Sequence, residues 1–177
     1  METHQLVEAT TADFTKIVAL VNIAYRSKIL KGWTSEADLV QGNRINVEQL
    51  KTLVNEAHKI FILKDGERII GCVQMNIQQK CCFLGMLTIH PDFQNQGLGK
   101  VVLQFAERYA IQHHDVDSFE ICVLNQRKLL IQFYQRRGYC ITHKKAPYPV
   151  DQNVGKPYLA DLFLLYLTKK LPFLHKF

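Results

Sequence analysis

A glycine-rich junction between a strand candidate and a helix candidate most constrains how this chain can fold. Residues 81–90 (CCFLGMLTIH) are apolar and carry β-branched residues near their end, a pattern that predicts a strand buried inside a sheet. A turn-rich segment containing Gly97 and Gly99 follows, and apolar residues at helical spacing begin at Val101. Two glycines therefore stand where a buried strand leads into a helix.

This junction is suited to binding an anion. The first turn of a helix has backbone N–H groups without partners and a partial positive charge from the helix dipole. Gly97 and Gly99 remove the side chains that would keep an anion away from the main chain. The segment is neither GxxxxGK[ST] nor GxGxxG followed by an acidic residue, which excludes the usual phosphate-loop motifs. A glycine-rich turn without a ligand is the alternative interpretation.

Composition is that of an ordinary globular protein. The 177 residues fit a single domain, 1–177, with 47% hydrophobic and 21% charged residues. No apolar run is long enough to span a bilayer, and the N-terminus lacks the regions of a signal peptide, so we expect a cytoplasmic protein and no membrane partner. The net charge of +6 suits a nucleic acid or a polyanionic small molecule equally well. Because the basic residues are scattered without an aromatic-basic platform, we expect no nucleic-acid partner.

Cysteines and histidines show no metal-binding spacing. The five cysteines lack a CxxC pair and lie mostly in apolar segments, which favours buried, reduced thiols over disulfides; they are Cys72, Cys81, Cys82, Cys122 and Cys140. The histidines form no HxxxH pair. We therefore predict no metal site.

The remaining patterns predict an ordered series of strands and helices. Strands are expected at 6–9, 59–64, 68–78, 81–90, 118–124, 139–143 and 158–167, helices at 13–25, 46–57, 101–114 and 127–137, and a loop at 144–157. The turns between the strands from 59 to 90 are too short for a crossover, so these strands should be antiparallel. The strand at 118–124 should enter the sheet parallel to the strand at 81–90.

Two motifs resemble those of the Gcn5-related N-acetyltransferase (GNAT) superfamily, whose members bind acyl-coenzyme A. QNQGLG at residues 94–99 has the form of its pyrophosphate loop, and FYQRRGY at residues 133–139 has the form of the end of its helix after the fifth strand. GWTSEADL at residues 32–39, together with QRRGY, is similar to a bacterial subgroup with undefined substrates. The resemblance implies an α/β (α+β) fold with a mixed, mostly antiparallel central sheet, flanking helices and a splayed parallel strand pair.

The resemblance also implies acetyl-coenzyme A (acetyl-CoA) as co-substrate. The pantetheine arm would pair with the main chain of the buried strand, and the pyrophosphate would rest on the glycine loop. The residues implied are Leu87, Thr88 and Ile89 for the arm, and Gln94, Asn95, Gln96, Gly97, Leu98, Gly99 and Lys100 for the pyrophosphate. Where the family often has an asparagine that anchors the arm, this chain has Arg127, and Asn125 is the nearby candidate for that role. A solvated helix lysine is the alternative for Lys100.

Catalytic roles follow from the same resemblance. The hydroxyl of Tyr134 would point at the coenzyme sulfur and protonate the leaving thiolate. The acceptor, a primary amine on a small molecule or a protein, must lose a proton before it attacks, so a base is needed. Glu120 on the parallel strand and Glu36 on the loop before the second helix are the candidates, and a surface or capping acid is the alternative for each.

The aperiodic segment 26–45 has two interpretations. It contains the only tryptophan, Trp33, and functional residues gather on such loops, which favours an acceptor-binding surface. A short helix capped by Thr34 or Ser35, with Glu36 near its positive end, is the other interpretation.

Function and assembly each leave alternatives open. A catalytically silent acyl-CoA-binding module would carry the same glycine loop as an enzyme, and a basic nucleic-acid adaptor is a third hypothesis. The apolar last strand and residues 171–174 (LPFL) can pair two subunits, so the sequence is compatible with a monomer or a homodimer.

Overall fold

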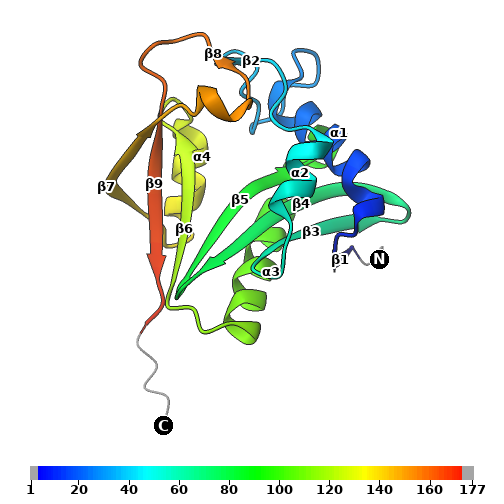
Figure 1. Ribbon diagram of the computed structural model, residues 1–177, viewed down its shortest axis with the longest axis vertical. Helices are drawn as coiled ribbons and strands as arrows, with labels where there is room; N and C mark the ends of the chain where they lie inside the picture. The colour runs from blue at the N-terminus through cyan, green and yellow to red at the C-terminus, as the bar shows by residue number, and fades with distance from the viewer. Residues whose placement is uncertain (1–3, 173–177) are drawn as a thin grey trace.

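The computed structural model describes residues 4–172, which form a seven-stranded mixed sheet with helices on both faces (Figure 1). Its strand order is β1-β3-β4-β5-β6-β9-β7, and every neighbouring pair is antiparallel except β5 and β6. The strands are β1 (Gln5–Glu8), β3 (His58–Asp65), β4 (Arg68–Gln78), β5 (Cys81–Ile89), β6 (Ser118–Leu124), β7 (Cys140–Pro147) and β9 (Phe163–Lys170). The expected fold class is therefore confirmed.

Helices cover the two faces because each has one apolar side. On one face, α1 (Phe14–Arg26) and α2 (Val47–Leu53) pack against the sheet through residues such as Ile17 and Leu50, which are fully buried. On the other face, α3 (Leu98–His113) and α4 (Lys128–Gln135) bury Val102 and Phe133. A second sheet of two short strands, β2 (Val40–Gln41) and β8 (Lys156–Pro157), lies beside the upper end of β9 in Figure 1. Short 3-10 turns occur at Thr11–Asp13, Pro91–Phe93 and Val150–Gln152.

A β-bulge in β5 opens the sheet. The β4–β5 register shifts between Cys72 and Gln74, so that two β5 residues, Met86 and Leu87, face Val73. Met86 adopts a φ of +45°, which re-aims the chain at this point. Beyond the bulge the strands part, since β5 pairs with β6 only over Cys81–Leu84 and Ser118–Ile121. Figure 1 shows β5 and β6 meeting at one end and separating at the other.

The C-terminal boundaries differ from the predicted ones. The segment 144–147, predicted as loop, belongs to β7, and the last strand begins at Phe163 rather than at Tyr158, which lies in a turn. The lysines of β7 led to the wrong prediction. They are compatible with a strand because β7 is the sheet edge, where charged side chains stay in solvent while the backbone pairs.

Three further expectations are corrected. Helix α2 ends at Leu53, short of the predicted 57, because Val54 turns to an extended conformation. No helix follows Thr34, where the chain forms turns instead. Cys122 and Cys140 are exposed, whereas Cys72 and Cys82 are buried as predicted, and all five thiols are free.

Within residues 4–172 no helix has the length and apolar character needed to cross a membrane. The same residues contain no group of three or more side chains able to hold a metal ion. Of the apolar tail considered for subunit pairing, Phe173 and Leu174 lie outside the described residues.

Candidate functional site

The glycine turn leaves the N-terminus of α3 open. Gly97 is the N-cap residue, with φ +78° and ψ 0°, a left-handed conformation that side chains disfavour. A Cβ placed on Gly97 would meet nothing within 4 Å. The conformation of the turn therefore requires glycine, while the space in front of the first helical N–H groups is free for a ligand.

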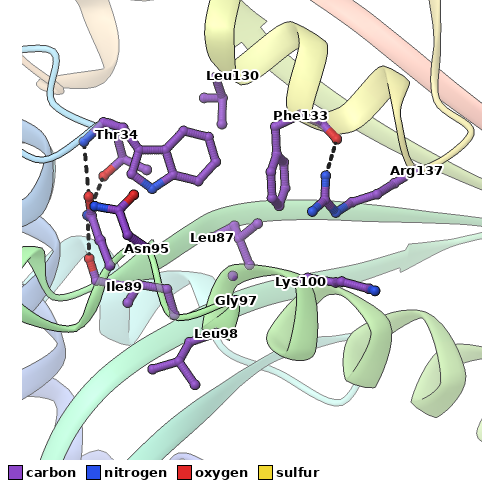
Figure 2. A pocket seen from close by; sticks show the side chains of 13 residues that line it. Thr34, Leu87, Ile89, Asn95, Gly97, Leu98, Lys100, Leu130, Phe133 and Arg137 are labelled. Carbon is purple, nitrogen blue, oxygen red and sulfur yellow. Dashed lines mark hydrogen bonds between the residues drawn. The ribbon is translucent and has the colours of Figure 1, made fainter.

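A cleft of about 100 Å³ lies in front of this turn (Figure 2). It brings together most of the residues expected to hold the coenzyme, namely Leu87, Ile89, Gln94, Asn95, Gly97, Leu98, Gly99 and Lys100. Sequence reasoning did not assign to it the other lining residues, which are Trp33, Thr34, Leu130, Phe133 and Arg137. Two more expected residues, the fully buried Thr88 and the exposed Gln96, do not line it.

Gln94 positions the loop opposite the glycine turn. Its buried side chain donates from Nε2 to the Ile89 carbonyl (2.9 Å), and its Oε1 accepts from the Trp33 backbone N–H (3.0 Å). A Cβ at Gly32 would lie 2.3 Å from this Oε1. Glycine at position 32 therefore lets the Gln94 amide join the end of β5 to the loop.

Two cations lie at one end of the cleft. Lys100 of α3 and Arg137, which follows α4, both line the cleft and lie on the right-hand side of the view in Figure 2. The Arg137 guanidinium carbon stacks 3.5 Å from the centroid of the Phe133 ring, and Nη1 donates to the Phe133 carbonyl (2.6 Å). Its Nε is buried without a hydrogen-bond partner among the described residues. Arg137 lies in the turn after the end of α4 at Gln135, and this turn, not a helix face, brings its guanidinium over the Phe133 ring.

A second, larger cavity of about 500 Å³ opens where β5 and β6 part. Its floor is formed by Leu84–Leu87 of β5 and Ile121–Leu124 of β6, and the segment 146–152 covers it. Leu87 and Leu130 line both this cavity and the cleft, so the two spaces adjoin.

Tyr134 lines the larger cavity. The side chain is 5% exposed, and no residue between 4 and 172 forms a hydrogen bond with the hydroxyl. Burial raises the pKa of Tyr134 above its usual value, so the hydroxyl stays protonated at neutral pH and is available as a donor. Nearby, the Tyr25 hydroxyl donates to the Leu87 carbonyl (3.2 Å), and burial raises the pKa of Tyr25 to about 12.

The two candidate bases occupy different places. Glu36 lines the larger cavity together with Tyr134, and its Oε2 lies 2.5 Å from Nη1 of Arg26. Arg26 also donates from Nη2 to the Val154 carbonyl (2.9 Å). Glu120 lines neither space and instead forms an ion pair with Lys144 on β7 (2.8 Å).

A sequence model described as the acetyltransferase (GNAT) family matches residues 18–139 of the chain. This protein belongs to the GNAT acetyltransferase family.

Solved structures agree with this family fold at low sequence identity. The ribosomal-protein-S18-alanine N-acetyltransferase of Escherichia coli is similar with a TM-score of 0.73 at 12% identity, over 98% of this chain and 97% of that one. A GNAT acetyltransferase from Elizabethkingia anophelis with acetyl-CoA bound has a TM-score of 0.67 at 19% identity, over 97% and 100%. The PaiA N-acetyltransferase of Thermoplasma acidophilum in complex with coenzyme A has a TM-score of 0.69 at 14% identity, over 96% and 99%. No curated protein matches the chain by sequence.

This GNAT member uses Arg127 differently from the asparagine that the family pattern often has there. The Arg127 guanidinium donates to the carbonyls of Trp33 and Ser35 and so holds the loop that Gln94 holds from the other side. Asn125, the nearby candidate for the coenzyme arm, accepts from the Phe163 N–H (3.1 Å) and lines neither space. Its side chain therefore positions the start of β9.

Proposed function

We propose that this protein is an N-acetyltransferase that binds acetyl-CoA and transfers the acetyl group to a primary amine by direct attack in a ternary complex. The observation that carries the proposal is the junction of two spaces: a cleft at an open helix N-terminus adjoins a larger cavity containing a protonated tyrosine. In this arrangement the thioester enters through the cleft, the amine enters through the larger cavity, and the two meet where these spaces adjoin. Similar structures that hold acetyl-CoA or coenzyme A support the choice of co-substrate.

In this proposal the cleft holds the coenzyme. The pyrophosphate accepts hydrogen bonds from the N–H groups at the start of α3, with Lys100 and Arg137 adding positive charge. The pantetheine arm runs along residues 85–89 of β5, which have no partner on β6, and its carbonyl groups accept from main-chain N–H groups there, since the Leu87 and Ile89 carbonyls already accept from Tyr25 and Gln94. The thioester then reaches the gap at Leu87 and Leu130, next to Tyr134.

The chemistry needs one proton acceptor and one proton donor. The amine nitrogen attacks the thioester carbonyl carbon, a C–N bond forms, and the C–S bond breaks when the tetrahedral intermediate collapses. The leaving thiolate takes the Tyr134 proton, which solvent later replaces, and the proton of the attacking amine passes to Glu36 directly or through water. Both carboxylates are ion-paired, but Glu36 is the better candidate base because it lines the cavity with Tyr134, whereas Glu120 lies outside it.

The test compares Tyr134→Phe with Tyr158→Phe, a change at an exposed tyrosine in a turn. Calorimetry measures acetyl-CoA binding, and chromatography of acetylated amines measures turnover. We expect Tyr134→Phe to lower kcat by about a hundredfold or more at an unchanged Kd, the size of a general-acid effect, and Tyr158→Phe to change neither. Normal binding without turnover of any amine by the wild type would favour the silent module instead. Absence of acetyl-CoA binding would refute the proposal.

A further inference from the structure

The larger cavity contains a cation that no described protein group neutralises. Arg44 is the only lysine or arginine among its described lining residues. Within residues 4–172 the Arg44 side chain forms neither an ion pair nor a hydrogen bond, whereas Arg26 is occupied by Glu36. Asp151 also lines the cavity but forms no ion pair with Arg44 among the described residues. The cavity therefore offers a half-buried guanidinium that is available to bind an anion.

The backbone at Arg44 is held in place. Its N–H donates to Oδ1 of Asn22 on α1 (2.7 Å), and Nδ2 of the same asparagine donates to the Ile45 carbonyl (2.9 Å). Ile45 is buried in the core beneath α1. The fold thus anchors Arg44 at the cavity wall, which reduces the entropy that a ligand must offset on binding.

The segment 146–152 lines one side of the cavity, which has the size of a small-molecule site. The Tyr148 hydroxyl donates to the Val154 carbonyl (2.7 Å), and Nε2 of Gln49, at the start of α2, donates to the Gln152 carbonyl (2.8 Å). These bonds hold the covering segment at two points. A volume of about 500 Å³ lies in the range of cavities that enclose metabolite-sized ligands.

The residues that line the cavity indicate which other groups the ligand contains besides an anion. Apolar and aromatic side chains provide most of the lining residues, among them Leu84, Met86, Leu124, Leu164 and Tyr166. Arg44 also lines an adjoining cavity of about 330 Å³, so the space continues past the guanidinium. The complementary ligand has an amine, an anionic group and an apolar body.

We propose that Arg44 binds the carboxylate of the acceptor, and that the acceptor is a free amino acid with an apolar side chain. This inference rests on the proposed function and specifies its substrate class. The planar guanidinium suits a carboxylate because it donates two parallel hydrogen bonds. The acetyl group of the thioester joins the α-nitrogen, the C–S bond breaks, and the products are an N-acetylamino acid and coenzyme A.

The test uses pairs of probes in which a neutral carboxamide replaces the carboxylate, compared at a pH at which the α-amine of both is largely deprotonated. L-leucine, L-methionine and L-phenylalanine are each compared with their carboxamides at saturating acetyl-CoA, and the acetylated products are quantified by chromatography. For the wild type we expect kcat/KM to be at least about tenfold higher for each acid than for its amide, as charged hydrogen bonds are stronger than neutral ones.

Variants assign this preference to Arg44. Arg44→Gln should lower kcat/KM for the acids about a hundredfold and leave the amides nearly unchanged, and Arg44→Lys should retain part of the preference. Arg108→Gln is the matched control, since Arg108 is an exposed arginine on α3 that lines none of these spaces. The Kd for acetyl-CoA, measured for every variant, shows whether the protein is folded and loaded.

Three results would overturn the inference. They are an equal kcat/KM for acids and amides in the wild type, an equal fall in kcat/KM for both in Arg44→Gln, or no acetylation of any acid. In each case wild-type binding of acetyl-CoA and turnover of an uncharged amine or a peptide N-terminus would leave the proposed function standing. Failure of the proposed function itself would appear separately, as a protein that does not bind acetyl-CoA.

Discussion

Replacing Gly97 with alanine should separate the folding role of the glycine turn from its binding role. At φ +78° an alanine pays about 1–2 kcal/mol of backbone strain. No steric cost adds to this, because the new Cβ would meet nothing within 4 Å. For a chain of 177 residues, each kcal/mol corresponds to a fall in Tm of about 2–4 °C.

The same methyl group would occupy the space in which we place the coenzyme pyrophosphate. A phosphate oxygen must come within about 2.9 Å of a backbone nitrogen to accept a hydrogen bond. Loss of one such bond to a charged group costs about 1.5–3 kcal/mol, which is a roughly ten- to hundredfold increase in Kd. Calorimetric titration of acetyl-CoA measures this change directly.

Gly66→Ala provides the matched control. Gly66 lies in the turn between β3 and β4 with φ +55°, and its Cβ would also meet nothing within 4 Å. Both variants should lose similar stability in thermal unfolding, but only Gly97→Ala should lose affinity. Wild-type affinity in Gly97→Ala, or an equal loss in Gly66→Ala, would refute the placement of the pyrophosphate.

Two further predictions concern stability. Burial lowers the pKa of His58, so the folded state disfavours its protonation, and stability should be complete above the unfolded pKa of about 6.5 and fall as the pH drops below it. Urea unfolding between pH 7.5 and 5 measures this fall in stability. His58→Gln should make the free energy of unfolding less dependent on pH, and an unchanged dependence in this variant would contradict the prediction. Gly32→Ala should destabilise the fold by about 1–3 kcal/mol by displacing the Gln94 amide. In the Gln94→Ala background, Gly32→Ala should lower the free energy of unfolding much less. Additive losses of stability in this double-mutant cycle would argue against a contact between residues 32 and 94.

Several elements could be read from local patterns. The limits of β4 at Arg68–Gln78 and of β6 at Ser118–Leu124 agree with the predicted ones, because each apolar run is bounded by turn-forming residues. Gly138, which directly follows the helix predicted at 127–137, has φ +89°, a conformation that glycine adopts without strain. The edge strand β7 was harder to predict from the sequence, because its lysines are typical of a loop and only its pairing with β9 shows that the segment is a strand.

Part of the candidate site was also predictable, because it too depends on a local pattern in the sequence. The glycine turn lies within one stretch of chain, so its residues alone indicate an open helix N-terminus. By contrast, Glu36 and Glu120 were equal candidates in the sequence, and only the packing puts the first beside Tyr134 and the second beside Lys144. Arg44 and Arg137 carried no distinguishing pattern, because scattered arginines differ in function only through the groups around them.

The sequence by itself determined the position of the glycine turn, because backbone preferences act between residues close in the chain, and its two motifs indicated the family and the fold class through their resemblance to GNAT members. The tertiary structure alone decided which distant side chains share a cavity. That outcome depends on the bulge at Met86, which parts β5 from β6 and thereby brings residues from α1, α4 and the 26–45 loop around one space.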